Sequence, residues 1–393
     1  MSGEETARDS VVFRYRSAER AREGHAYASM RRRLYIGESV LGLAYLLFWL
    51  LSGVSQGLQG RLAGAVGNRY ATIALYVLVF VVAMVLISLP LSYYSGLVLP
   101  RRHGLSHQSV GSWLVDQAKG LGIGVLFAVV ALEILYLLIR TLPDLWWLPA
   151  ASAYVAFAVV LTNLAPVLLL PIFNKLRPLE NEALVHRARR LAEREGIRLV
   201  GIFTMDMSRR TSTTNAALTG LGNTRRMIVG DTMVDRYPDE EIETVLAHEL
   251  GHHVHGDIWK GIALQGLLTL GVLYVIFHVL RAFSGSLGLG TPADIATLPL
   301  LALAFTLLSL ILSPFLSGFS RWRERKADLY ALCVSEPRAF ASAMGRLADQ
   351  NLAENQPPRW AELIMADHPS IADRICLAHS LAGDQRRRGE ACM

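Results

Sequence analysis

Long runs of apolar residues alternate with polar segments along this chain. Each run approaches the roughly 20 residues that a helix needs to cross the apolar part of a bilayer. A single run of this kind could be a buried core helix, but several in one chain favour a polytopic membrane protein. The runs lie near residues 36–56, 72–95, 120–139, 146–173, 261–280 and 294–317. We therefore expect six membrane-spanning helices.

The composition supports this picture. Of the 393 residues, 52% are hydrophobic and 18% are charged, and the mean hydropathy is +0.33. Such a chain is too apolar for an ordinary soluble surface, but it fits a protein that is partly covered by lipid. These values exclude a disordered or fibrous chain. The net charge is only +6, so we also expect no nucleic-acid partner.

Residues 1–35 contain eight Arg and five acidic residues but no apolar stretch ahead of a small-residue cleavage site. We therefore expect no removable signal peptide, and the first apolar run serves as the first anchor. The three cysteines, Cys333, Cys376 and Cys392, lack CxxC spacing. They predict neither a disulfide framework nor a thiolate metal site, and they fit a reducing compartment for this end of the chain.

The distribution of Lys and Arg between the connections predicts the orientation. Basic residues are dense in residues 1–35 and 174–260, whereas the connection after the first run holds only Arg61 and Arg69. Because positively charged connections tend to stay in the cytoplasm, we expect the N-terminus, the long polar segment and the C-terminal tail on that side. An even number of spans then places both large polar segments in one compartment.

This reading divides the chain into five regions. The 28-residue run at 146–173 leaves one alternative open, a hairpin bent at Pro149 or Pro166, which would separate the two polar segments. The expected regions are a basic tail at 1–35, four spans at 36–173, a polar segment at 174–260, two spans at 261–317 and a second polar segment at 318–393.

The first polar segment shows a mixed pattern. Residues 180–196 have apolar positions at helical spacing, and residues 198–206 and 226–233 are typical of strands. The Thr- and Gly-rich stretch between the two strands suits a hairpin or an edge strand. A further helix begins after Pro238 with acidic residues in its first turn.

That helix carries an HExxH motif, in which His248 and His252 flank Glu249. Residues four apart project from one face of a helix, so two imidazoles can hold one metal while the glutamate reaches a water beside it. A surface helix with unrelated polar residues is the alternative. A catalytic zinc site of this kind requires a third protein ligand and an open fourth position.

A candidate third ligand follows the sixth run. Glu324 and Asp328 are four residues apart at the start of a polar helix, so one can bind the metal and the other can hydrogen-bond a ligand histidine. An exposed charged helix would explain the same residues. His255 lies near the face of His248 and could replace Glu324 as a ligand, although we favour a supporting or solvated role.

These segments together resemble the integral-membrane zinc metalloproteases of the Ste24 or CAAX prenyl protease 1 type, in peptidase family M48. The resemblance extends from about residue 100 to 375. Its segments are Asn174-Lys175 with Pro178-Leu179, Met205-Asp206, Asn215-Ala216 through Gly220-Leu221-Gly222 to Asp231-Thr232, VLAHELGHH, SRWRERKAD, and His368-Pro369 with Arg374. Several matched segments in order are far more specific than HExxH alone.

The resemblance implies a fold and a set of roles. The fold is a mainly α-helical polytopic membrane protein with about six spans and a cytoplasmic α+β, zincin-like metalloprotease domain that two spans divide. Zinc is implied as the cofactor, and a polypeptide substrate and the lipid bilayer as the partners. The implied residues are the zinc ligands His248, His252 and Glu324, the general base Glu249, the supporting Asp328, the substrate-pairing backbone of Asn215 and Ala216, and the cleft residues His368 and Arg374.

The chain departs from the family in two respects. Eukaryotic members are usually described with seven spans around a large chamber, whereas six are expected here, and the extended N-terminal tail has no recognised counterpart. Because Arg strongly outnumbers Lys, we associate the chain with a GC-rich bacterial genome and an inner membrane. Bacteria generally lack prenylation, so a CAAX substrate is not assumed.

Two functions are therefore expected from different classes. The first is a membrane-embedded zinc endopeptidase that cuts membrane-linked or unfolded polypeptides at the cytoplasmic face. The second is a non-catalytic scaffold or transporter with a structural zinc site. The intact Glu249 favours the first, because structural zinc needs no base, whereas a closed site in which His255 completes a set of four protein ligands would favour the second.

Overall fold

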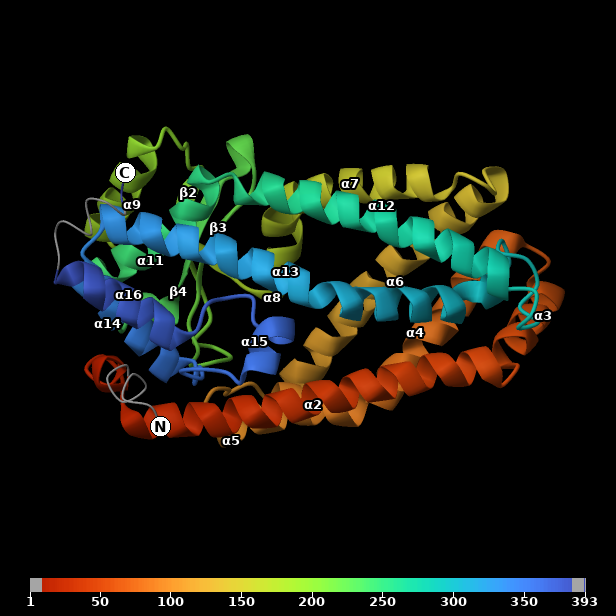
Figure 1. Ribbon diagram of the computed structural model, residues 1–393, viewed down its shortest axis with the longest axis horizontal. Helices are drawn as coiled ribbons and strands as arrows, with labels where there is room; N and C mark the ends of the chain where they lie inside the picture. Colours follow the sequence, from red (N-terminus) through yellow and green to blue (C-terminus); the bar gives the residue numbers. More distant parts are fainter. Residues whose placement is uncertain (1–8, 384–391, 393) are drawn as a thin grey trace.

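Six helices in the computed structural model, which describes residues 9–383 and 392, are long and apolar enough to cross a membrane. Together they form an elongated bundle with a mixed α/β lobe at one end (Figure 1). The expected number of spans is confirmed. They are built by α2 (Ala18–Leu51), α4 (Arg69–Tyr93) with α5 (Leu99–Arg102), α6 (Val110–Thr141), α7 (Trp147–Leu164) with α8 (Leu170–Phe173), α12 (Asp257–Phe283) and α13 (Leu298–Val334).

The long run at 146–173 forms one continuous span and not a hairpin. Helix α7 passes through a π-helical turn at Ala165–Leu169 into α8. Proline lacks the backbone N–H that an α-helix requires, and a wider turn can absorb the missing bond. The two polar segments therefore meet at the same end of the bundle, as Figure 1 shows, and helix α2 begins at that end as well.

The spanning helices extend well beyond their apolar runs. Helix α2 begins at Ala18, where the Ser17 hydroxyl caps it by accepting a hydrogen bond from Arg20 N–H. It therefore crosses the expected boundary at residue 35 without a break. Helix α13 likewise continues from the membrane bundle into the lobe, where it carries Glu324 and Asp328. One rigid helix thus links the sixth span to the polar residues beyond it.

The lobe is built on a four-stranded sheet with the order β1-β2-β4-β3. Strands β2 and β4 are parallel, and the two outer strands pair with them antiparallel. The strands are β1 (Leu176–Pro178), β2 (Gly201–Met205), β3 (Ala216–Thr219) and β4 (Arg226–Gly230). The two strands expected from the sequence are confirmed, and the Thr- and Gly-rich stretch between them supplies the edge strand β3.

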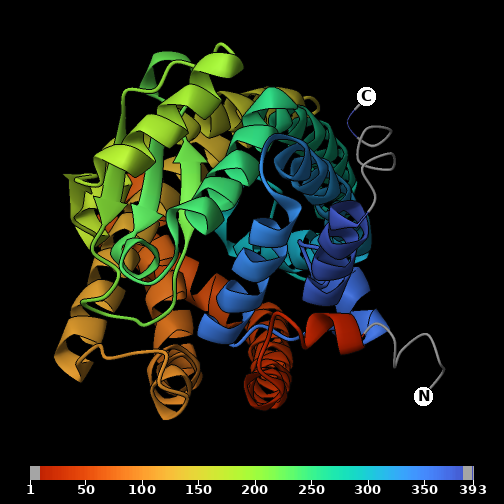
Figure 2. The ribbon, with the colours of Figure 1, turned by 90° about the vertical axis from the view of Figure 1, so that its left-hand side faces the viewer.

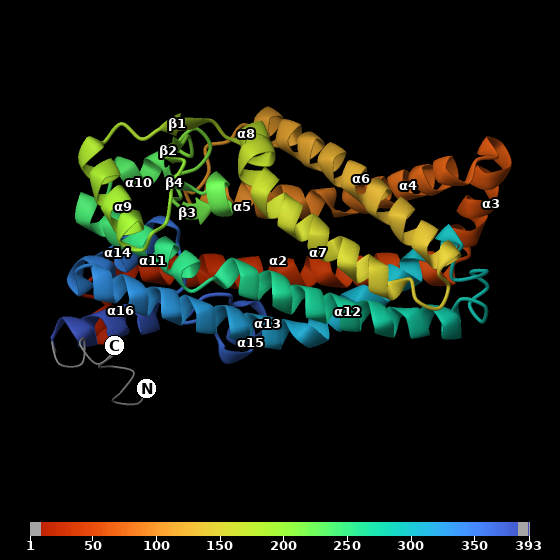
Figure 3. The same ribbon diagram turned by 90° about the horizontal axis from the view of Figure 1, so that it is seen from above.

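The sheet shares one core with helices from both polar segments, and Figure 2 shows these elements gathered in the lobe. In α9 the apolar stripe predicted at Leu184, Ala188 and Leu191 is buried against that core. Figure 3 shows the lobe gathered beyond one end of the long helices. The lobe helices are α9 (Glu182–Arg194), α10 (Asp231–Val234), α11 (Asp239–Val254), α14 (Pro337–Gln350), α15 (Arg359–Met365) and α16 (Ile371–Ala382), and a short helix, α3 (Val54–Val66), follows the first span.

The expectation for the cysteines was wrong for one pair. Cys333, in the last turn of α13, forms a disulfide with Cys392, with 5.6 Å between their Cα atoms. The sequence did not reveal this pairing because the partners are 59 residues apart and only the fold brings them together. Disulfides are typical of oxidising compartments, so this bond speaks against the reducing surroundings expected for this end of the chain.

Candidate metal centre and cleft

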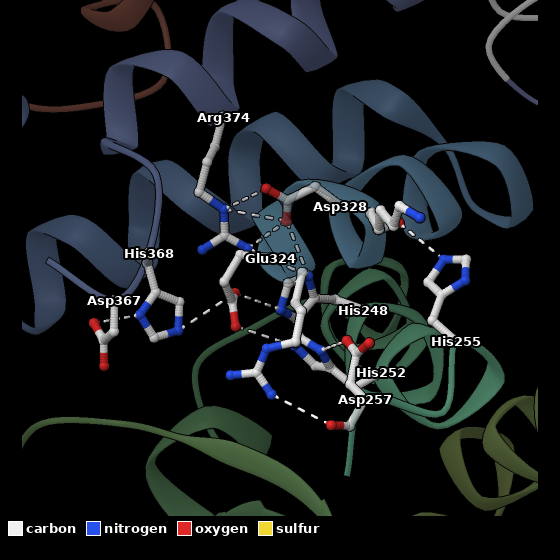
Figure 4. Close-up of polar contacts among 11 residues, drawn as sticks. His248, His252, His255, Asp257, Glu324, Asp328, Asp367, His368 and Arg374 are labelled. Atoms are coloured by element: carbon white, nitrogen blue, oxygen red, sulfur yellow. Dashed lines mark hydrogen bonds and ion pairs between the residues drawn. The ribbon is translucent and has the colours of Figure 1, made fainter. Parts of the chain in front are cut away.

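The HExxH motif lies on α11, which packs against α13. A methyl group added at Gly251 would lie 3.1 Å from the Cα atom of Ala327, so glycine permits the two helices to approach closely. Four residues apart on α11, His248 and His252 turn their rings toward α13. Figure 4 shows both rings converging on the Glu324 carboxylate. The residues predicted as metal ligands on separate polar segments thus lie together.

The three side chains have the spacing that a metal requires. The Nε2 atom of His248 lies 3.3 Å from Glu324 Oε2, and the Nε2 atom of His252 lies 3.2 Å from Glu324 Oε1. Ligands about 2.05 Å from a tetrahedral zinc ion are separated by roughly 3.3 Å. The buried Glu324 Oε2 atom has no hydrogen-bond partner in the described residues. The donor set and its geometry therefore fit a zinc ion.

A carboxylate orients each of the two histidines. Asp328 Oδ1 lies 2.9 Å from His248 Nδ1, as the sequence predicted, and Asp257 Oδ2 lies 2.9 Å from His252 Nδ1. When Nδ1–H donates to a carboxylate, the lone pair of Nε2 is left to face a metal. Sequence reasoning missed Asp257. Asp257 follows His252 by five residues, and a turn at Gly256 (φ 65°) lies between them. Helical spacing therefore does not predict that the two side chains meet.

Electrostatics also couple these residues. Burial opposes protonation of His248, but the neighbouring carboxylates of Asp328 and Glu324 outweigh this effect and raise its pKa to about 9. The same partners stabilise either a proton or a metal cation on the imidazole. Burial lowers the pKa of the neighbouring His253, which fits a neutral ring whose Nε2–H donates to the Leu218 carbonyl, 3.0 Å away.

Arg374 lies behind the metal cluster, on α16. Its Nε donates to Asp328 Oδ2 at 2.9 Å and its Nη2 to Asp328 Oδ1 at 2.6 Å. Asp328 is only 1% exposed, so this paired contact compensates a buried charge and leaves Oδ1 directed at His248. The structure therefore joins Arg374 to the metal cluster through Asp328.

His368 lies on the open side of the cluster, in the loop after α15. Its side chain is 50% exposed, and its Nε2 lies 3.4 Å from Glu324 Oε2. Its Nδ1 lies 2.8 Å from Asp367 Oδ1, which fixes the orientation of the ring. His255 faces elsewhere, with its Nε2 3.3 Å from the Lys326 carbonyl oxygen. Only His248, His252 and Glu324 form a potential metal cluster within the described residues.

A cleft of about 530 Å³ runs past this cluster. Glu249 lines it, and so does the first part of the edge strand β3. Of the residues predicted from the sequence, it brings together His248, Glu249, Asn215, Ala216, His368 and Arg374. The catalytic and substrate-pairing residues expected from the resemblance therefore share one cavity.

The strand β3 presents a free edge toward this cleft. Gly230 N–H donates to the Asn215 carbonyl, so the backbone of residue 215 faces β4. In an antiparallel pair, adjacent residues face opposite sides, and the backbone N–H and carbonyl of Ala216 therefore point away from β4. The backbone groups of Leu218 also point away from β4, and its carbonyl oxygen already accepts a hydrogen bond from His253. Ala216 N–H lies 2.9 Å from the Asn215 side-chain oxygen, which holds that side chain across the edge.

Comparison with known families accounts for nearly the whole chain. The model described as the CAAX prenyl protease N-terminal region with five membrane helices matches residues 11–175. The model for peptidase family M48 matches residues 178–381. The expectation that the N-terminal tail has no counterpart is therefore wrong from residue 11 onward.

Individual relatives agree with the family models. An uncharacterised metalloprotease of Bacillus subtilis, YhfN, is 32% identical over 340 residues, which cover 85% of this chain and 80% of the relative. CAAX prenyl protease 1 of Saccharomyces cerevisiae is 31% identical over 314 residues, which cover 74% and 68% of the two chains. The crystal structure of S. mikatae Ste24p superimposes with a TM-score of 0.81 at 25% identity, covering 92% of this chain and 89% of that one.

Replacing Asp257 tests its role in orienting His252. We expect Asp257→Ala to weaken zinc binding by roughly 10- to 100-fold, because the ligand histidine loses its oriented tautomer. The measurement is zinc affinity by competition with a chelator. Asp235→Ala, at an exposed position of the same lobe, should leave the affinity unchanged. Equal affinity in both variants would show that Asp257 does not support the metal.

Proposed function

Because this chain belongs to peptidase family M48, it is a membrane metalloprotease, and we propose that it hydrolyses extended polypeptides with zinc held by His248, His252 and Glu324. One observation carries this proposal above the others. The cleft that exposes Glu249 beside the ligand cluster also exposes a free strand edge. A catalytic group and a surface for an extended peptide therefore lie side by side.

The residues of the chain divide the chemistry between them. When bound at this site, zinc supplies a Lewis acid that makes water more acidic and polarises a peptide carbonyl. Glu249 lies next to a ligand histidine and lines the cleft, so it is placed to take a proton from the attacking water and pass it to the leaving amine. It is the general base and then the general acid.

His368 is the better placed of two candidates to stabilise negative charge on the substrate oxygen. It is half exposed, faces the cleft and lies beside Glu324. Arg374 directs its Nε and one terminal nitrogen to Asp328. We therefore assign the direct contact with the reacting carbonyl to His368 and propose that Arg374 acts by holding Asp328 against His248.

The edge strand β3 selects the form of the substrate. A peptide that adds a strand beside Ala216 needs an unpaired backbone, which folded proteins do not offer. The substrate class is therefore an unfolded, extended or membrane-tethered polypeptide. We leave prenylation of the substrate out of this proposal, although several relatives carry the name CAAX prenyl protease 1.

We place the cleft on the cytoplasmic side of a bacterial inner membrane. The dense Arg content near the N-terminus and in the first polar segment supports this orientation, and a bacterial relative matches 85% of this chain. The disulfide between Cys333 and Cys392 is the observation that opposes it. A direct test of topology is therefore part of the proposal.

A structural zinc site in a scaffold or transporter is the weaker alternative. It would need a fourth protein ligand, for which His255 was the sequence candidate. The ring of His255 instead contacts the Lys326 carbonyl, and the described cluster contains three ligands. This arrangement leaves the fourth position open and favours catalysis.

Glu249→Gln separates metal binding from proton transfer. The amide cannot accept the proton, so we expect kcat to fall by at least about 100-fold while bound zinc stays near one per chain. Peptide hydrolysis and metal content of the purified protein are the measurements. Full activity in this variant would contradict the assignment of the base.

Backbone methylation of a peptide substrate tests the strand pairing. A strand uses the N–H groups of alternate residues on one side, so methylating these amides one at a time should raise KM at every second position near the scissile bond. The intervening positions serve as internal controls. Uniform tolerance of methylation would rule out pairing with β3.

Alkaline phosphatase fusions test the orientation in a bacterial host. A reporter fused after residue 383 should be inactive because it stays in the cytoplasm, whereas one inserted after Gly290, between α12 and α13, should be active. The reverse pattern would place the cleft outside and would agree with the disulfide. Mobility on non-reducing gels then shows whether Cys333 is paired.

A further inference from the structure

The N-terminal residues pack closely against the lobe that contains the cleft. Figure 2 shows them beside the C-terminal helices, although they are remote in sequence. The contacts fall on α14 and on the loop that follows it, residues 351–357. A methyl group added at Gly24 of α2 would lie 2.7 Å from the Ala353 carbonyl oxygen and 3.1 Å from that of Leu352. Helix α2 therefore touches the backbone of this loop.

Arg16 is the centre of this contact. It is only 4% exposed, and its guanidinium binds the loop and the end of α14 from one side. All four contacts fix backbone or side-chain oxygens of residues 348–355. Arg16 donates to Asp349 Oδ1 at 2.9 Å, Asn355 Oδ1 at 2.5 Å, the Ala353 carbonyl at 2.6 Å and the Ala348 carbonyl at 3.3 Å.

The loop is held in a conformation that it would not adopt alone. Leu352 has φ 50°, a left-handed conformation that is unfavourable for a bulky residue. Its side chain is buried in a cluster with Tyr27, Leu99 and Leu105. Because surrounding structure must stabilise such a residue, the bonds from Arg16 and the packing of Tyr27 on α2 keep the loop in place.

Consecutive residues at the end of α14 connect this contact to the substrate edge. Asp349 faces the N-terminal residues, binding Arg16 and the Ser17 N–H. The next two residues face the strand leading into β3. Gln350 donates to the Ser212 carbonyl at 2.7 Å. Asn351 binds both backbone groups of residue 214, accepting from its N–H at 2.9 Å and donating to its carbonyl at 3.0 Å.

We propose that Arg16 is a positioning residue for substrate binding, which acts through the loop at 351–355 to hold Thr214 and so the free strand edge at Ala216. Arg16 binds residues on both sides of Asn351 in the sequence, at 348–349 and at 353 and 355, and Asn351 binds Thr214, the residue before Asn215. Arg16 itself is absent from the cleft lining. This inference rests on the proposed function, because it takes β3 as the surface that binds the peptide.

The N-terminal residues also form one wall of the cleft. Ala28 of α2 lines it, together with Ala353 and Glu354 of the loop. The Glu354 carboxylate is paired with Arg32 and lies 2.5 Å from His25 Nδ1, both of which belong to α2. Arg16 and the start of α2, which are adjacent in the sequence, thus hold the strand edge and the wall, and displacing this N-terminal segment changes both sides of the peptide site.

The experiment measures peptide binding and amide exchange in the full-length Glu249→Gln protein, which binds without cleaving. Arg16→Ala should weaken binding of an unfolded fluorescent peptide by roughly tenfold, equivalent to one or two lost strand hydrogen bonds, while zinc content stays constant. Arg16→Lys, which retains the charge but not the fork of donors, should restore only part of the affinity. Arg22→Ala, at an exposed position of the nearby helix α2, is the control.

Amide hydrogen exchange supplies a readout that does not need a substrate. In Arg16→Ala, the amide of Thr214 and the neighbouring edge residues should exchange faster, whereas α11 should keep its protection. Asn351→Ala should give the same local pattern. The double variant should bind the peptide no more weakly than the weaker-binding of the two single variants, because both substitutions break the same chain of contacts.

Gly24→Ala provides an independent route if Arg16→Ala does not fold. Alanine favours the helical state of α2, so any loss of peptide affinity comes from pressure on the Ala353 carbonyl and not from a weaker helix. Unchanged affinity and unchanged exchange at Thr214 in a folded variant would overturn the proposal. Faster exchange throughout the lobe would also overturn it, because it would show a general loss of stability.

The same data separate this inference from the proposed function. If the wild type cleaves no peptide and Glu249→Gln binds none, the proposed function fails. The hydrogen-exchange rate of the Thr214 amide in Arg16→Ala then still shows whether Arg16 holds the strand edge. If peptides bind and are cleaved but Arg16→Ala is indistinguishable from Arg22→Ala, only the positioning role is lost.

Discussion

The structure depends on two carboxylates that are buried on one helix. Glu324 and Asp328 lie within α13, and a buried charge is costly unless other charges or hydrogen bonds compensate it. The compensation comes from His248 and His252 on α11 and from Arg374 on α16. Three helices from two separate polar segments are therefore joined at one point. The side chains that compensate the buried carboxylates of α13 therefore also complete the candidate metal site.

The membrane bundle sets the position of that point. Helix α13 runs without interruption from the sixth span to Asp328, and α12 begins at Asp257, whose carboxylate orients His252. The helix of the fifth span thus begins at a residue of the candidate metal centre, and the helix of the sixth span continues to two others. A shift of one span along its axis would move a ligand or its partner directly. This coupling explains why a protease domain can be divided by two membrane helices and still form one cleft.

The sequence predicted the parts of the molecule that follow a local period or a known spacing. The six spans, the stripe on α9, the strands around residues 202 and 228 and the HExxH face of α11 are of this kind. Asp257 and the pair Cys333–Cys392 were missed because their partners are set by a turn and by the tertiary fold. The same holds for residues 1–35, which we expected to be a basic tail and whose charge pattern does not indicate that α2 reaches the cleft. Local patterns carry no information about which surfaces meet.

The position of Ala216 shows what the tertiary fold adds to a motif. Strand order leaves β3 at the edge of the sheet, and the alternation of the antiparallel pair turns only alternate backbone groups toward the cleft. Leu218 is already occupied by His253, a neighbour of the ligand His252. A peptide strand would therefore pair at Ala216, because the backbone of Asn215 faces β4 and both backbone groups of Thr214 are bound by Asn351. Helix α11, through His253, limits one end of this proposed peptide site, and the loop after α14, which the N-terminal residues support, limits the other.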